Sequence, residues 1–268
     1  MKHPRCKVTL SLLVLIAGVT ILAAEKRPEV VDGKNEAPAA LDAERIGKAA
    51  GARASTTADG VVRVGWERTD VKVTVEGIPL KPFAGLGSWA AFEATLHGAI
   101  LMGDTVVFED EITPAMDATF EAGLEVTALH NHFIFDEPKV YFMHIGGQAN
   151  AENLATGVKR VWDTIKEVRA KQPEPAKRIP GDVPLAGKID ASVIEKILKM
   201  KSEAQDGVVK VTIGREGMMH GVKLSGSMGL TSWVAFSGSD RFAAVDGDFI
   251  MAAEEVQPVL RALRKAGT

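Results

Sequence analysis

Hydrophobic and polar residues alternate along two neighbouring stretches in the middle of the chain. In residues 124–132 every second side chain is apolar until the series ends in His130 and His132, and residues 140–144 repeat the pattern up to His144. Side chains two positions apart share one face of a β-strand. The pattern therefore predicts two strands that carry these histidines on the apolar face, pointing inward.

The two predicted strands are close enough in sequence to form a β-hairpin. A turn centred on Glu137 leaves a five-residue loop, which is a common length. This register predicts His130 directly opposite His144, and His132 opposite Phe142. Opposed residues have Cβ atoms roughly 5 Å apart, so three of the chain's six histidines would meet on one inward face.

Three imidazoles at that separation can share a divalent metal ion. The residues leave three uses open: metal binding, structural hydrogen bonding among buried imidazoles, and metal-free acid–base chemistry or ligand binding. A metal site would consist of His130, His132 and His144. Zinc is the default ion because imidazole is a common zinc ligand. No catalytic residue is identified.

The other candidate ligands have less support from the pattern. Glu137 lies in the predicted turn and is interpreted as solvated. Asp104 and Asp248 each follow a glycine and are interpreted as turn formers. His97 and His220 are interpreted as loop residues. The fourth ligand of a metal site therefore stays open.

The pattern outside the histidine hairpin predicts further strands and helices. A helix over 151–170 is indicated by apolar residues at helical spacing, with Asn150 as its cap, and this apolar stripe should pack on the sheet. A helix over 114–122 is indicated by a proline at its first position and a glycine after its end. The remaining predicted elements are a short helix over 41–50 and strands over 60–66, 71–75, 88–96 and 105–108.

An internal duplication extends over most of the chain. Three segments of the first copy, at 59–64, 88–92 and 103–104, return in the second copy at 206–211, 232–236 and 247–248. The histidine hairpin and the long helix have no counterpart in the second copy. We therefore predict an α+β fold of two repeated units, each an antiparallel sheet packed by helices, with the second unit incomplete. Its terminal sheet edge would lie open, and a homo-oligomer could form through that edge.

The N-terminus is typical of an export signal. Lys2, Arg5 and Lys7 precede an apolar run over 8–22, which is short for a membrane span, and small residues follow it. We expect a periplasmic or secreted protein with no membrane span after cleavage. The predicted domains are a signal peptide (1–24), a flexible tether (25–40), a first repeat with the histidine hairpin (41–171), a proline-rich linker (172–187) and a second repeat (188–268).

The composition of the chain excludes some classes of partner and of metal ligand. The isoelectric point is about 6.1 and no basic cluster is interleaved with aromatic residues, which argues against nucleic acid as a partner. The single cysteine, Cys6, lies inside the predicted signal peptide. A mature protein without cysteine has no disulfides, and any metal site in it must use histidines and carboxylates.

The histidine segment resembles that of the LppY/LpqO family of exported bacterial proteins, a domain of unknown function. The resemblance rests on Gly-Leu-Glu-Val-Thr-Ala-Leu-His-Asn-His at 123–132, on Phe-Met-His at 142–144, and on the repeated Gly-Asp and Ser-Trp-x-Ala-Phe segments. It implies an exported, duplicated α+β protein and brings no reaction with it. Family members usually carry a histidine segment in the second copy as well, and several are lipoproteins; this sequence has neither feature.

Two functions from different classes remain open. The first is an exported protein of uncharacterised activity with a three-histidine, zinc-like site, in which a metal-dependent hydrolase or lyase is one option. The second is a non-enzymatic envelope module that binds an unidentified small ligand or protein partner through the hairpin face. The second function predicts an apolar pocket lined by Phe142, His130 and His144. Whether the protein is an enzyme is left open.

Overall fold

The computed structural model describes residues 38–176 and 187–268, which form two compact units. We call residues 38–176 the first unit and residues 187–268 the second unit. The predicted signal peptide and most of the predicted tether and linker lie outside the described residues. Within the described ranges, no helix is long and apolar enough to cross a lipid bilayer.

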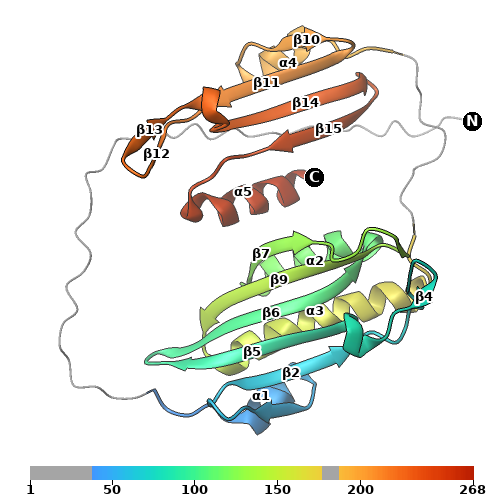
Figure 1. Ribbon diagram of the computed structural model, residues 1–268, viewed down its shortest axis with the longest axis vertical. Coiled ribbons are helices and arrows are strands. Elements are labelled where there is room, and N and C mark those ends of the chain that lie inside the picture. The colour runs from blue at the N-terminus through green and yellow to red at the C-terminus, as the bar shows by residue number, and fades with distance from the viewer. Residues whose placement is uncertain (1–37, 177–186) are drawn as a thin grey trace, which may run out of the picture. The chain divides into compact units, whose positions relative to one another are not determined.

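The first unit is built on a six-stranded antiparallel sheet with the strand order β1-β2-β5-β6-β9-β7 (Figure 1). The elements of this unit are α1 (Ala43–Ala50), β1 (Ala54–Thr56), β2 (Val62–Glu67), β3 (Thr74–Val75), β4 (Ile78–Pro79), the 3-10 helix η1 (Pro82–Ala84), β5 (Gly87–Thr95), β6 (Gly98–Phe108), α2 (Glu109–Glu121), β7 (Glu125–His130), β8 (Asp136–Glu137), β9 (Val140–Ala149) and α3 (Ala151–Lys171).

Three helices cover one face of this sheet, with α3 between α1 and α2. The helix α3 begins at Asn150, whose side chain accepts hydrogen bonds from the Glu152 and Asn153 amides. Its apolar stripe is buried against the sheet, and the Trp162 indole donates a hydrogen bond to the Thr105 hydroxyl at 3.2 Å. The predicted helix over 151–170 is confirmed.

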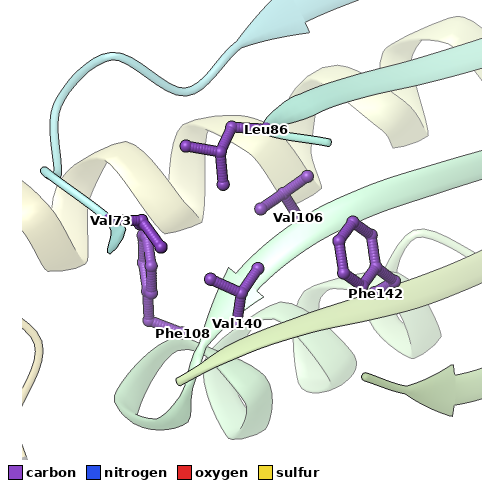
Figure 2. Close-up of a cluster of buried hydrophobic side chains, with 6 residues drawn as sticks. All are labelled: Val73, Leu86, Val106, Phe108, Val140 and Phe142. Atoms are coloured by element: carbon purple, nitrogen blue, oxygen red, sulfur yellow. The ribbon is translucent and has the colours of Figure 1, made fainter. Parts of the chain in front are cut away.

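Among the described residues, the opposite face of the sheet carries no α-helix, and we call it the helix-free face. One end of it is covered by a small sheet of order β4-β3-β8 and by the segment before β5. Beneath this cover lies a cluster of buried apolar side chains (Figure 2), consisting of Val73, Leu86, Val106, Phe108, Val140 and Phe142. The cluster joins the covering loops to β6 and β9, so it fixes this end of the helix-free face.

The second unit repeats the first with fewer elements. Its main sheet has the order β10-β11-β14-β15, and a separate hairpin pairs β12 with β13. The elements are α4 (Ala191–Leu198), β10 (Glu203–Gln205), β11 (Val208–Gly214), β12 (Gly217–Met219), β13 (Val222–Leu224), the 3-10 helix η2 (Gly226–Met228), β14 (Thr231–Ser239), β15 (Phe242–Asp248) and α5 (Ala253–Ala266).

The strand registers confirm the duplication and the α+β fold. Trp89 on β5 lies opposite Asp104 on β6, and Trp233 on β14 lies opposite Asp248 on β15. The second unit contains no counterparts of β9, β7 and α3 among its described residues. As predicted, β15 is therefore the last strand of its sheet.

The predicted helix over 114–122 starts five residues too late. The helix α2 begins at Glu109 and contains Pro114 in its interior. Its start is fixed by Glu111, whose carboxylate accepts a hydrogen bond from the Phe108 amide at 2.9 Å. A side chain that caps from within the first turn outweighs the preference of proline for the first helical position.

A buried ion pair links Arg68, the residue after β2, to α2 in the first unit. The Arg68 guanidinium donates two hydrogen bonds to the Glu111 carboxylate, both at 2.8 Å, and a third to the Val106 carbonyl oxygen. Burial alone would lower the pKa of Arg68, but its hydrogen bonds to Glu111 and Asp70 outweigh burial, so the pKa is raised and the charge is kept. Both side chains of the pair are fully buried.

The same pair recurs in the second unit as Arg215 and Glu255, which form two hydrogen bonds at 2.6 and 3.1 Å. Here the two side chains are 41% and 36% exposed. The duplication thus provides one buried ion pair and one partly exposed copy of it. The effect of burial on the strength of the pair can therefore be compared within one molecule.

We expect Arg68→Met to destabilise the first unit by about 1–3 kcal/mol, because the buried Glu111 carboxylate and the Val106 carbonyl oxygen lose the hydrogen bonds that Arg68 donates. Glu111 keeps one cationic partner, since Arg169 Nε lies 2.7 Å from Glu111 Oε1. Arg215→Met should cause a much smaller loss, because water can solvate Glu255. Urea unfolding followed by tryptophan fluorescence measures the first change, since three of the four tryptophans lie in the first unit. Equal losses for the two variants would contradict the difference in burial.

Candidate functional site

The histidine hairpin forms, but its register differs from the predicted one. In β7 and β9, His130 lies opposite Phe142, and Ala128 lies opposite His144. The predicted pairing of His130 with His144 is therefore wrong by two residues. A β-bulge between Val126 and Ala128 shifts the register by one further residue, so Val126 lies opposite Ile145, on the other face from His130. The prediction that Val126 and His130 share a face is therefore also wrong. The connecting segment is also longer than a five-residue turn, because Asp136–Glu137 pairs with β3 as the separate strand β8.

The three imidazoles nevertheless gather at one place. The His130 ring centroid lies 5.0 Å from that of His132 and 4.9 Å from that of His144. The Nε2 atoms of His130 and His132 are 3.0 Å apart. His132 follows the end of β7, and its ring stacks on Phe142 with centroids 3.7 Å apart and an angle of 10° between the planes. His130 and His144 are diagonal neighbours on adjacent strands and share the helix-free face.

The segment that carries His132 is held by a buried carboxylate. The Asp136 side chain accepts hydrogen bonds from the Val140 amide at 2.7 Å and from the Lys139 ammonium at 2.9 Å. The same ammonium donates to the Ile134 carbonyl oxygen. Burial alone would raise the pKa of Asp136, but these hydrogen bonds lower it below its usual value. The loop is therefore fixed by an ionised group.

Asp104 is the site residue that the sequence pattern missed. It lies within β6, not in a turn, and the register places it directly opposite His144. The distance from Asp104 Oδ1 to His144 Nε2 is 3.9 Å, and the Asp104 side chain is only 14% exposed. Its Oδ1 atom is buried with no hydrogen-bond partner. Burial raises the pKa of the Asp104 carboxyl, although positive charge on the three imidazoles would lower it.

One signal in the sequence could have identified Asp104. It is the only acidic residue in the otherwise apolar or small stretch 99–108, where an exposed turn would not be expected. The glycine before it also has a structural reason. A Cβ on Gly103 would lie 3.0 Å from the Trp89 carbonyl oxygen and 3.0 Å from the Ile145 side chain, so the strands need a glycine there to approach closely.

A row of side chains crosses the helix-free face next to the histidines. The Arg63 guanidinium lies 4.6 Å from the centroid of the Trp89 ring, and Trp89 lies opposite Asp104. The second unit repeats this arrangement, with the Lys210 ammonium 4.1 Å from the centroid of the Trp233 ring. Only the first row continues into a histidine, because the described second unit has no counterpart of β9.

The site is open to solvent rather than enclosed. His130 and His144 are partly exposed and His132 is exposed, so the prediction that all three point inward holds only in part. Phe142 is buried in the apolar cluster and is covered by His132, so it does not form the wall of an open pocket. Glu137 is exposed in β8. His97 lies in the turn between β5 and β6, and His220 lies in a turn of the second unit.

The histidines are not arranged as a ready coordination sphere. Within residues 38–176 and 187–268, no group of three or more histidine, cysteine, aspartate or glutamate side chains is placed to hold a metal ion. The structure instead shows three neighbouring imidazoles beside the Asp104 carboxylate. The Oδ1 atom of this carboxylate is buried and has no hydrogen-bond partner.

One comparison with known proteins finds a relationship. A family model described as Domain of Unknown Function (DUF1259) matches residues 44–164 and 192–268, so it covers both copies of the repeat. No curated protein and no solved structure matches the chain. The description of the family does not carry the name LppY/LpqO, and that resemblance stays a prediction.

We expect Asp136→Ala to loosen the segment that carries His132, because the Val140 amide then loses its buried acceptor at a cost of about 1–3 kcal/mol. The pKa of Asp136 is lower in the folded state, so its contribution is present above the unfolded value of about 3.9 and is lost as the pH falls through the folded value. Acid unfolding followed by fluorescence should show a weaker pH dependence in the variant. Unchanged amide exchange across 131–140 in the variant would contradict this role.

Proposed function

The chain belongs to the family described as Domain of Unknown Function (DUF1259), and we propose that it is a metal-binding protein that holds a divalent ion with His130, His132 and His144. The observation that carries this proposal is the meeting of three imidazoles beside a buried carboxylate oxygen that has no partner. A cation at this place would satisfy the carboxylate and would use ring nitrogens that otherwise face each other.

The distances are compatible with small adjustments around an ion. Two nitrogen ligands of tetrahedral zinc, each about 2.0–2.1 Å from the metal, lie about 3.3 Å from each other. The Nε2 atoms of His130 and His132 are 3.0 Å apart. His144 and Asp104 need to approach more closely than their present 3.9 Å separation suggests. Rotation of the partly exposed His144 imidazole can bring its nitrogen closer to Asp104, and His132 can adjust separately because it lies outside the strand ladder.

Asp104 is the fourth group in this proposal. It can bind the ion directly, or it can hold His144 in the correct orientation, as carboxylates commonly do for metal-bound histidines. Three imidazoles with an open fourth position would allow water activation and hydrolase or lyase chemistry. Four protein ligands on zinc would close the site and favour a structural or metal-carrying role. The proposal therefore specifies the binding of an ion and leaves the reaction open.

The predicted signal peptide places this activity in the periplasm or outside the cell. In such a compartment a mature chain without cysteine depends on histidine and carboxylate for metal binding. This donor set suits zinc and other first-row divalent ions.

One observation favours the alternative, a non-enzymatic module that binds a ligand or a protein partner. The segment between β7 and β9 exposes Ile134 and Phe135, and the neighbouring η1 exposes Phe83 completely. Large apolar side chains exposed together are typical of contact surfaces. A module of this kind would fold without metal, so chelation would leave its melting temperature unchanged.

We expect elemental analysis of the protein, purified without chelator, to find about one divalent ion per chain. His132→Ala should release it, because one of three imidazole ligands is lost, whereas His97→Ala should retain it as the matched control. A wild-type protein without metal would refute the proposal, and so would equal metal loss in both variants.

A second experiment addresses Asp104. We expect Asp104→Asn, which keeps the shape and removes the charge, to weaken metal affinity by about 10–100-fold. Asp248→Asn changes the equivalent residue of the second unit and should leave the affinity unchanged. Competition with a chromogenic chelator measures both constants, and equal affinities for the two variants would exclude Asp104 from the site.

A further inference from the structure

A methionine lies beside the histidine site on the same face of the sheet. Met102 on β6 is 65% exposed. It precedes Asp104 by two residues in an unbroken strand ladder, so both side chains belong to the helix-free face. The other methionine of this ladder, Met143, lies on the opposite face and is fully buried. The ladder thus presents one accessible thioether on the face that carries the histidines.

The strand register places Met102 within reach of His144. Met102 is paired with Gly146, and Asp104 is paired with His144, so Met102 and His144 are diagonal neighbours on adjacent strands. Diagonal neighbours lie about 7–8 Å apart, a separation that long side chains can bridge. A diagonal relation on the other side of β9 brings the rings of His130 and His144 to a centroid distance of 4.9 Å.

The residues directly opposite Met102 leave its side chain room to move. These residues are Ala91 on β5 and Gly146 on β9, and neither carries more than a methyl group. The methionine side chain is unbranched and has three rotatable bonds, so it adapts to its surroundings. The Met102 sulfur can therefore turn toward the His144 ring, since no bulky side chain stands directly opposite it on either strand.

The second unit does not keep this methionine. The Gly-Asp pair at 103–104 corresponds to the pair at 247–248, so the position equivalent to Met102 is Asp246. The aspartate of the pair and the tryptophan opposite it are present in both units. Among the described residues, the methionine occurs only in the unit that has the three site histidines. This distribution associates the thioether with the histidine site and not with the repeated fold.

The openness of the site and its donor atoms both favour copper. Sites made of nitrogen and oxygen donors bind divalent copper more tightly than divalent zinc, unless the protein enforces another geometry. Here the three rings are partly or fully exposed, and within the described ranges they are not held as a coordination sphere. The protein therefore imposes little geometry on the ion. A thioether is a soft ligand and selects monovalent copper.

We propose that the histidine site is a copper site, in which the Met102 thioether joins His130, His132 and His144 as a ligand. This inference rests on the metal-binding function proposed above and specifies its ion. Asp104 then orients His144, as carboxylates commonly do for metal-bound imidazoles. The predicted mature chain has no cysteine, so methionine is its only sulfur ligand. Met102 is the residue that allows the site to hold monovalent copper.

Affinities for two ions test the role of the thioether. The full chain with Cys6→Ser serves as the reference, because this change removes the one thiol that could bind monovalent copper elsewhere. Competition with chromogenic chelators gives the dissociation constants for Zn(II) and, under anaerobic ascorbate, for Cu(I). We expect Met102→Leu to weaken Cu(I) binding by about tenfold or more, and to leave Zn(II) binding unchanged within about twofold.

Met218→Leu is the matched control, because Met218 is an exposed methionine of the second unit. It should leave both dissociation constants unchanged. X-ray absorption at the copper edge of the Cu(I)-loaded protein should show one sulfur neighbour in the reference and in this control, and none in Met102→Leu. The absorption spectrum of the reference reports the ligand directly, even if a substitution alters the stability of the fold.

The proposal is overturned if Met102→Leu leaves Cu(I) binding unchanged, or weakens Cu(I) and Zn(II) binding equally, because a thioether ligand distinguishes the two ions. It is also overturned if the reference has no sulfur neighbour or binds Zn(II) more tightly than Cu(I). In these cases the three-histidine site still stands if His132→Ala releases the ion. A reference chain that binds neither ion would instead refute the metal-binding function itself, and the copper site with it.

Discussion

The pairing of β6 with β9 is the interaction on which the rest of the molecule depends. It is an unbroken antiparallel ladder from Ala99 opposite Ala149 to Phe108 opposite Val140. On one face of the sheet the ladder supports α3, and on the other it places Asp104 beside His144. In the second unit β15 is the equivalent of β6, and the described residues contain no equivalent of β9, so the ladder and the histidine site that it positions are found in the first unit.

The sequence predicts the general plan well because that plan rests on periodicity and repetition. The alternation in β7 and β9 correctly assigns His130 and His144 to one face, and the repeated segments correctly predict two related units. The alternation is a local signal, and the repetition is found by comparing the chain with itself. The helical spacing of the apolar residues in α3 likewise predicts correctly which side of this helix is buried.

The pairing register could not be predicted in the same way. It depends on a bulge after Val126 and on the pairing of Asp136 with β3, a strand about sixty residues away in sequence. Neither contact leaves a periodic signal in the hairpin itself. The rings still converge because His130 pairs two residues away from its predicted partner, which keeps it on the face of His144. The bulge, in contrast, places Val126 opposite Ile145 and therefore on the other face of the sheet.

Asp104 shows a different limit of sequence reasoning. A glycine followed by an aspartate is typical of a turn, and only the close approach of β5 explains why a glycine is needed within this strand. Once the strand is recognised, the alternation places Asp104 on the histidine face, inside a stretch that is otherwise apolar. The burial of its carboxylate is then a cost that a neighbouring positive charge can offset.

The duplication also shows which part of the proposed site is particular to the first unit. Both units carry a cation over a tryptophan that lies opposite an aspartate, but only the first has a histidine on the next strand. The aspartate and the cation over the tryptophan are therefore common to both units, and the first unit differs by the strand β9, which brings His144 opposite Asp104. Asp104 and Asp248 thus occupy equivalent strand positions with different neighbours, and among the described residues the proposed metal site depends on β9.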